Sequence, residues 1–255
     1  MRWLTNIWKR EIDYRSVVSH PIIDIHTHIL PGLDDGVRSR EAAVKMAQQA
    51  EEFGVTHIVA TPHYNNMYKP GHQEVRERME ELVSAVKAAG CSVTLMTGRE
   101  VSFTDCHIAD LKADEALHYP GGKKYILLEI ADGITRTTLI EGVFSLMTTG
   151  ILPVIAHPER SSLLIKNPEL AEELRERGVL LQLDSASLLK AHGRHSMAFA
   201  KKLVDRKQVD VISSDAHRSE HYTHFTQACQ YIFNLHGEEY FKAITCDAPG
   251  KILNL

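Results

Sequence analysis

The chain has 255 residues, of which 44% are hydrophobic and 24% are charged, and its formal net charge is −4. A chain of this length can bury a full core within one domain. The slight acidic excess argues against a polyanion-binding surface, so we expect no nucleic-acid partner. No continuous apolar stretch reaches about 18 residues, the length that would predict a membrane-spanning helix. We therefore expect a cytoplasmic protein.

The first 20 residues stand outside the regular pattern of the rest, so we predict an N-terminal extension at 1–20 and a domain at 21–255. The extension is expected to form a helix, because its large apolar side chains repeat at helical spacing. They are Trp3, Leu4, Ile7, Trp8 and Ile12. Packing of this helix on the domain or in a homo-oligomer contact is favoured over peripheral contact of residues 1–18 with a membrane. The segment lacks the apolar core of a signal peptide.

Apolar runs alternate with amphipathic segments along the rest of the chain. We predict strands at 22–28, 57–63, 93–101, 125–130, 151–157, 179–184 and 209–214. Helices are predicted at 39–53, 73–89, 104–112, 137–149, 168–177, 195–206 and 222–235, with Ser39 as an N-cap. The strands are continuous apolar runs, which is typical of parallel strands. This alternation predicts a single-domain α/β fold, a closed or distorted TIM-like (β/α)7 barrel.

Histidines and carboxylates end six of these strands. The segments are Asp24-Ile25-His26-Thr27-His28, Thr61-Pro62-His63, Gly98-Arg99-Glu100, Ile126-Leu127-Leu128-Glu129, Ile155-Ala156-His157 and Ser214-Asp215-Ala216-His217. The C-terminal ends of the strands form the active site of a βα barrel. Charged groups there are costly unless they are paired or bind a metal. Mixed imidazole and carboxylate ligands suit Zn, Mn or Fe better than Ca or Mg. The sequence therefore predicts a multinuclear metalloenzyme.

The first of these motifs leaves one role open. A period of two places Asp24, His26 and His28 on one side of a strand, so the two histidines can reach one ion. Asp24 could instead accept a hydrogen bond from a ligand imidazole. In the loop that follows, Asp34-Asp35-Gly36 is by itself typical of an ordinary turn. Histidines outside the motifs are predicted to be surface or structural residues. They are His20, His57, His72, His107, His118, His192, His195 and His236.

The cysteines exclude one phosphatase mechanism. Cysteine phosphatases need an arginine six positions after the nucleophilic cysteine, so that both groups share one phosphate. The residues at that spacing are Thr97, Lys112, Leu235 and Ile252. We expect all four cysteines to be small, reduced hydrophobic residues.

The ordered motifs resemble those of the PHP (polymerase and histidinol phosphatase) superfamily. The set comprises DxHxH, Asp-Asp-Gly, Thr-Pro-His, Gly-x-Glu, Leu-Glu, Ala-His-Pro-Glu-Arg and Ser-Asp-x-His, and the resemblance covers residues 22 to 253. Within the superfamily, His28 to Gly36 and His157-Pro158-Glu159-Arg160 are similar to the bacterial manganese-dependent protein-tyrosine phosphatases of capsule and exopolysaccharide loci. The resemblance implies a barrel of the PHP type.

The resemblance also implies two to three divalent ions, with Mn preferred and Fe or Zn as alternatives. The first ion would be held by His26, His28, Glu100 and Asp215, the second by Glu100, Glu129 and His157, and the third by Asp35, His63 and His217. Asp35 is preferred to Asp34 because the family's ligand directly precedes the glycine.

Catalytic roles follow from the same resemblance. We expect Arg160, His63 and Asp215 to be catalytic, with Arg160 binding phosphate just past a predicted ligand. The alternative for Arg160 is a surface residue at a helix start. Relatives often carry an arginine a few residues after Ser-Asp-x-His. Arg218 is expected to bind phosphate in its place; the alternatives are that a nearby histidine substitutes or that the role is lost. Asp184 stands where relatives commonly have a neutral residue.

The implied reaction is metal-dependent hydrolysis of phosphotyrosine on the tail of a bacterial tyrosine autokinase that controls polysaccharide synthesis and export. A phenolate leaving group, with a pKa near 10, needs less help from a general acid than an alkoxide would, and the sequence offers no obvious dedicated acid. One alternative is a small-molecule phosphatase of the histidinol-phosphate type. A non-catalytic PHP scaffold module is disfavoured, because none of the expected ligands is lost.

Overall fold

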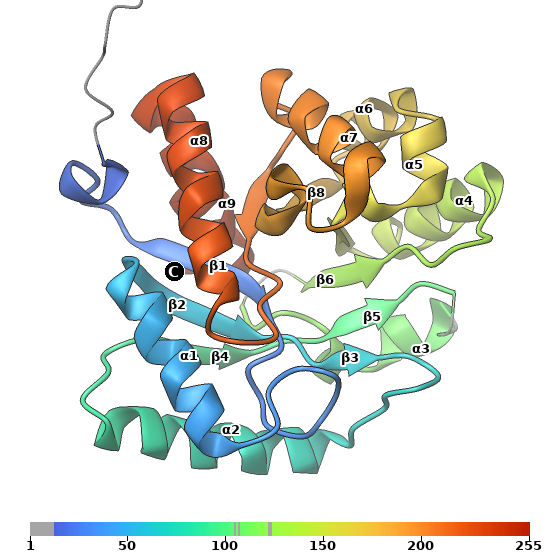
Figure 1. Ribbon diagram of the computed structural model, residues 1–255. Coiled ribbons are helices and arrows are strands. Elements are labelled where there is room, and N and C mark those ends of the chain that lie inside the picture. The colour runs from blue at the N-terminus through green and yellow to red at the C-terminus, as the bar shows by residue number, and fades with distance from the viewer. Residues whose placement is uncertain (1–12, 105, 107, 122–123) are drawn as a thin grey trace, which may run out of the picture.

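The computed structural model describes residues 13–104, 106, 108–121 and 124–255 (Figure 1). Its strands are β1 (Ile22–Thr27), β2 (Val55–Ala60), β3 (His63–Tyr64), β4 (Thr94–Thr97), β5 (Glu100–Ser102), β6 (Lys124–Glu129), β7 (Ile151–Ala156), β8 (Leu180–Asp184) and β9 (Val211–Ser213). All of the strand pairs are parallel and form two sheets, β1-β2-β4 and β3-β5-β6-β7-β8-β9.

Two stretches of the chain run directly from a strand of the first sheet into a strand of the second. The predicted strand 57–63 corresponds to β2 followed by β3, and the predicted strand 93–101 corresponds to β4 followed by β5. The first path is interrupted at Pro62, which has no N–H group to donate to a neighbouring strand. Hydrogen bonds still cross the interruptions, from Thr61 N to Thr27 O at 2.8 Å and from Gly98 N to Ala60 O at 2.8 Å.

The barrel closes between its last and first strands. Thr27 and Ala216 form a parallel bridge. His28 N donates to Ala216 O at 2.8 Å, and Asp215 N donates to His26 O at 3.0 Å. The predicted distorted (β/α)7 barrel is therefore confirmed, and its distortion lies where β2 and β4 break.

Helices cover the outside of the barrel. They are α1 (Arg40–Glu52), α2 (His72–Ala88), α3 (Ile108–Ala113), α4 (Arg136–Met147), α5 (Ser162–Lys166), α6 (Glu169–Glu176), α7 (Gly193–Asp205), α8 (His221–Lys242) and α9 (Ala248–Leu253). Shorter turns are η1 (Tyr14–Ser16), η2 (Glu115–Leu117), η3 (Pro158–Arg160), η4 (Ser185–Leu189) and the π-helical η5 (Ala243–Asp247). In Figure 1, α1 and α2 flank the β1-β2-β4 sheet, and α4 to α7 flank the larger sheet.

Most predicted helices agree with the structure, and two differ in extent. The helix predicted at 104–112 is the short α3, and the helix predicted at 222–235 continues as α8 to Lys242. Gly237, with φ of 80°, breaks the regular geometry within α8. Ser39 caps α1 as expected, because its side chain accepts a hydrogen bond from Ala42 N.

Alternation along β6 shows how the barrel directs side chains to its centre. Ile126 and Leu128 belong to the large cluster between strands and helices, whereas Tyr125 and Leu127 belong to the smaller cluster inside the barrel. Glu129 continues the series of Tyr125 and Leu127, so a period of two directs it towards the interior. β6 thus places the carboxylate of Glu129 at its C-terminal end, on the side of the strand that faces the barrel interior.

The described part of the extension is anchored to the domain. Tyr14 is fully buried, its backbone N–H donates to Gln230 Oε1 at 3.1 Å, and its ring lies 5.1 Å from that of Phe241. The predicted helix at the start of the chain falls mainly on residues 1–12, which lie outside the described residues. No helix among those described is both long and apolar enough to cross a membrane.

Candidate metal centre

The C-terminal edge of the barrel brings together all nine side chains predicted as metal ligands. They form four overlapping groups, and within each group the possible ligand atoms lie within 4.8 Å of one another. The groups are His26–His28–Asp215, His26–Glu100–His157, His63–Glu100–Glu129 and His28–Asp35–His63–His217. The grouping differs in detail from the expected one, because His157 groups with His26, Glu129 groups with His63, and His28 joins the group around Asp35.

Two imidazoles and two carboxylates converge at the centre of these groups. His26 Nε2 and His28 Nε2 lie 3.3 Å apart. Asp215 Oδ1 is 3.3 Å from the first nitrogen and 3.2 Å from the second. Glu100 Oε2 is 3.3 Å from each. Both oxygens are buried and have no hydrogen-bond partner among the described residues.

The opposite ring nitrogens decide what this centre can hold. His26 Nδ1 lies 2.8 Å from Gln182 Oε1, and His28 Nδ1 lies 2.7 Å from Asp34 Oδ2. Both oxygens can only accept, so each Nδ1 carries a proton, and each neutral Nε2 presents a lone pair to the centre. Lone pairs and carboxylate oxygens that meet in this way repel one another unless a cation lies between them. The donor set therefore fits a divalent metal ion.

The pKa values show how the same groups behave when only protons are present. Burial lowers the pKa of His26, but the carboxylates of Glu100 and Asp215 outweigh it and raise the value to about 9. Burial raises the pKa of Glu100, but His26 and the neighbouring imidazoles outweigh it and hold the value well below its usual range. Protons and metal ions therefore compete for these sites.

Glu100 connects the groups. Its Oε1 lies 2.8 Å from His157 Nε2, and its Oε2 lies 2.9 Å from His63 Nδ1. It is fully covered by the surrounding protein, with an exposed fraction of 1%. A carboxylate that faces different imidazoles with its two oxygens can bridge neighbouring ions, as multinuclear hydrolases require.

The third expected group lies nearer to solvent. Asp35 Oδ1 is 3.5 Å from His63 Nε2 and 3.4 Å from His217 Nε2. The Asp35 side chain is 52% exposed. His217 is fixed through its other nitrogen, Nδ1, at 2.9 Å from the carbonyl oxygen of Asp215. Asp35 thus lies where the resemblance implied a ligand.

Asp34 faces the other way and holds the loop. Its Oδ2 contacts His28 Nδ1 and accepts a hydrogen bond from His63 N at 3.0 Å, while its Oδ1 accepts one from Gly36 N at 2.9 Å. A side chain at Gly36 would collide with the backbone oxygen of His28. The Asp-Asp-Gly segment therefore combines a candidate ligand, an imidazole acceptor and a close backbone contact.

The sequence leaves open whether Asp24 accepts a hydrogen bond from a ligand imidazole, and in the structure its carboxylate contacts backbone N–H groups and a tyrosine instead. Its Oδ1 accepts hydrogen bonds from Ser214 N at 3.1 Å and His26 N at 3.3 Å, and its Oδ2 accepts one from Tyr222 Oη at 2.9 Å. Asp24 thus fixes the backbone where β1 meets the end of β9. Gln182 is the acceptor for His26 instead. The signal that could have identified it is a lone polar residue within the apolar run of β8.

Two residues of the centre have left-handed backbone geometry. His157 has φ of 30° and Asp215 has φ of 47°. Such conformations cost a non-glycine residue roughly 1–3 kcal/mol each and persist when the surrounding structure fixes them. His157 directly follows β7, and Asp215 lies two residues after the end of β9.

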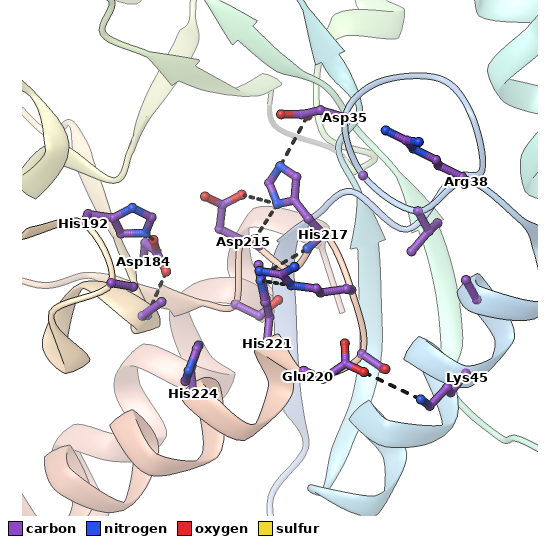
Figure 2. Close-up of a pocket in the computed structure, with 18 of the residues that line it drawn as sticks. Asp35, Arg38, Lys45, Asp184, His192, Asp215, His217, Glu220, His221 and His224 are labelled. Atoms are coloured by element: carbon purple, nitrogen blue, oxygen red, sulfur yellow. Dashed lines mark hydrogen bonds and ion pairs between the residues drawn. The ribbon is translucent and has the colours of Figure 1, made fainter.

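An open cavity of about 800 Å³ lies over one side of the centre (Figure 2). Both expected phosphate-binding residues line it. Arg160 Nη1 lies 2.6 Å from Asp215 Oδ2, and its side chain is 33% exposed. Arg218 is exposed, and its Nε donates to His221 Nε2 at 2.9 Å. Arg160 therefore reaches the metal groups directly, whereas Arg218 points along the cavity wall.

The sequence matches the family model for capsular polysaccharide synthesis, CpsB/CapC, over residues 22–254. The chain is similar to the tyrosine-protein phosphatase YwqE of Bacillus subtilis, with 33% identity over 212 residues that cover 83% of each chain. It is also similar to the tyrosine-protein phosphatase CpsB of Streptococcus pneumoniae, with 27% identity over 239 residues, or 91% of this chain and 98% of the relative.

Solved structures show the same relationship. A crystal structure from work on YwqE and CpsB, described as unique metal-dependent tyrosine phosphatases, has a TM-score of 0.82 and 33% identity, and the match covers 91% of this chain and 94% of that chain. An amidohydrolase from Mycoplasma synoviae has a TM-score of 0.60 at 16% identity, covering 91% of this chain and 87% of that chain. The second likeness shows the barrel fold alone.

Proposed function

The chain belongs to the CpsB/CapC family of capsular polysaccharide synthesis, and from this premise we propose that it is a metal-dependent protein-tyrosine phosphatase. The observation that carries the proposal is the convergence of the buried Glu100 and Asp215 oxygens on two imidazole nitrogens, beneath a cavity lined by arginine. Such a donor set holds cations, and such a cavity accepts a phosphate ester.

We assign the nine side chains of the four groups as ligands for two to three divalent ions, with Mn preferred over Fe or Zn. Divalent ions, when bound, activate water and neutralise the charge of a phosphoryl group. The protein orients the ligands through Gln182 and Asp34, which hold the imidazoles of His26 and His28 by their Nδ1 protons. Fixed tautomers keep both Nε2 lone pairs directed at the centre.

Arg160 binds the phosphoryl oxygens in this proposal. Its guanidinium already lies beside Asp215, and its planar N–H groups can contact two oxygens of one phosphate at once. His63 and Asp215 complete the catalytic set by holding the centre close to the bound phosphate. Arg218 gives the outer part of the cavity a second positive group.

We propose that the substrate is the phosphorylated tyrosine-rich tail of a membrane-associated tyrosine autokinase that controls polysaccharide export. The family's role in capsular polysaccharide synthesis supports this substrate. The open cavity supports it as well, because an extended peptide can present a phenyl phosphate to a site that is not enclosed.

The test is hydrolysis of a phosphotyrosine peptide by the purified protein, compared with histidinol phosphate. Activity should require Mn²⁺, disappear on exhaustive chelation and return when Mn²⁺ is added back. His26→Ala combined with His28→Ala should abolish activity, whereas His195→Ala, which changes an exposed histidine, should not. Activity that survives chelation would overturn the metal mechanism. A strong preference for histidinol phosphate would overturn the protein substrate.

A further inference from the structure

Strand β8 ends in a carboxylate that belongs to none of the four candidate metal groups. Asp184 lies at the same edge of the barrel as the candidate ligands, and its exposed fraction is 1%. Its Oδ1 accepts a hydrogen bond from Ala186 N at 2.8 Å. Its Oδ2 lies 2.5 Å from His192 Nε2 and 3.9 Å from Arg160 Nη1. A buried carboxylate is costly unless it is paired, and these two groups are its partners.

His192 connects this buried carboxylate to the cavity. It lies in the turn between η4 and α7, and its side chain is 33% exposed. It lines the same cavity as Arg160, Asp215 and His217. In Figure 2, His192 and Asp184 lie together on one side of the cavity, away from Arg38 and Lys45. The sequence predicts a surface or structural histidine here, and its place in the cavity lining is the observation that allows a further role.

We propose that His192, oriented by Asp184, is the catalytic residue that gives a proton to the departing tyrosine oxygen. The inference rests on the proposed phosphatase function. Asp184 Oδ2 lies 2.5 Å from Nε2 as an ion pair, so the carboxylate fixes the position of the ring and Nδ1 is the nitrogen left to supply the proton. Histidine is suited to this exchange because it titrates near neutral pH.

The step balances as an in-line displacement. A water-derived oxygen forms a bond to phosphorus on the side of the metal groups. The bond between phosphorus and the phenolic oxygen breaks on the opposite side, and its electron pair stays with the phenolic oxygen. That oxygen takes the proton from Nδ1, which leaves neutral imidazole with its remaining proton on Nε2, beside Asp184. Solvent then returns a proton to His192, whose side chain is partly exposed.

The other basic groups of the cavity fit this role less well. Both ring nitrogens of His221 face N–H donors, because His217 N donates to Nδ1 at 3.3 Å and Arg218 Nε donates to Nε2 at 2.9 Å. Donors on both sides disfavour the doubly protonated ring, so His221 is poorly arranged to donate a proton. His224 lies further along α8 and farther from Asp215 in Figure 2, and it has no ion-pair partner among the described residues. Arginine does not release its proton in proteins.

The test compares leaving groups with His192→Gln, Asp184→Asn and the control variant His224→Gln. A general acid matters most when the leaving group is a poor one. His192→Gln should lower kcat/KM for a phosphotyrosine peptide by roughly 10²-fold or more, the usual contribution of general acid catalysis. Hydrolysis of p-nitrophenyl phosphate, whose leaving group is far more acidic, should be nearly unchanged. Asp184→Asn should show the same selectivity with a smaller loss, and His224→Gln should affect neither substrate.

Metal content and thermal melting, measured on each variant, separate a chemical effect from loss of folding or of ions. An equal loss for both substrates in His192→Gln would make His192 a phosphate-binding or structural residue and overturn the proposal. An unchanged variant would overturn it as well, and so would a leaving-group-selective loss in His224→Gln. If the wild-type protein hydrolyses phosphotyrosine but His192→Gln fails these expectations, only this inference falls. If the wild type hydrolyses no phosphotyrosine, the proposed function falls first.

Discussion

Arg160 Nη1 lies 2.6 Å from Asp215 Oδ2, so a guanidinium contacts one of the carboxylates of the candidate metal centre directly. Burial alone would lower the pKa of this guanidinium, but Asp215 and Asp184 outweigh burial and raise it further. The group therefore keeps its charge where a phosphate would enter. A surface arginine at a helix start, the alternative interpretation of the sequence, would not be placed between two buried carboxylates.

The first prediction concerns this arginine. Arg160→Ala should weaken binding of phosphate and of the transition state without emptying the metal centre. Loss of a hydrogen bond to a charged group costs roughly 1.5–3 kcal/mol, which is about a 10- to 150-fold fall in kcat/KM. Steady-state kinetics together with metal analysis would test this, with Arg206→Ala, at an exposed position, as the control. Unchanged kinetics in Arg160→Ala would return the residue to a surface role.

The second prediction concerns the acceptor behind His26. Gln182→Leu removes the oxygen that lies 2.8 Å from His26 Nδ1, so the imidazole loses its fixed tautomer. Mutation of a residue that orients a ligand imidazole typically lowers metal affinity by about 10- to 100-fold. Gln182→Glu keeps an acceptor oxygen and should retain more affinity than Gln182→Leu. Titration of the chelated proteins with Mn²⁺ would measure both constants. Equal affinities in the two variants would show that Gln182 only fills space.

The third prediction is that thiol chemistry plays no part in turnover. Cys229 is fully buried, and burial raises the pKa of its thiol well above the usual range, so the reactive thiolate is suppressed. None of the four cysteines lines the cavity over the metal groups. Treatment with iodoacetamide, or replacement of all four cysteines, should leave kcat within a few-fold. Inactivation that follows modification of a single cysteine would contradict this.

The site was more predictable than the contacts that support it. His26, Glu100 and Asp215 stand out in the sequence because polar residues end apolar runs, and parallel strands must bring such ends to one edge. The sequence does not contain the distance between side chains of different strands. For this reason the sequence leaves the role of Asp24 open and does not identify Gln182 as the imidazole acceptor, although both are polar residues in apolar strands.

The pair of Asp184 and His192 illustrates a second limit. Eight positions and a 3-10 turn separate the two residues, so no strand or helix period relates them. Only the path of the chain through η4 brings the imidazole back over the end of β8. The strand interruption at Pro62 was also not predicted. A continuous apolar run predicted one strand, whereas the chain passes there from one sheet to the other.

The last prediction concerns the start of the chain. The apolar face formed by Trp3, Leu4, Ile7, Trp8 and Ile12 lies outside the described residues, so its role as a packing or membrane-binding helix stays a prediction. Deletion of residues 1–12 removes this whole face and spares Tyr14, whose buried ring anchors the extension to α8. If the segment contacts a membrane, the deletion should lower binding to anionic vesicles, because apolar burial and attraction of basic residues both contribute to such binding. Cosedimentation with vesicles would measure it, and p-nitrophenyl phosphate hydrolysis should stay unchanged, since the metal centre lies at the barrel edge. Unaltered vesicle binding combined with a smaller mass in solution would instead favour packing in a homo-oligomer.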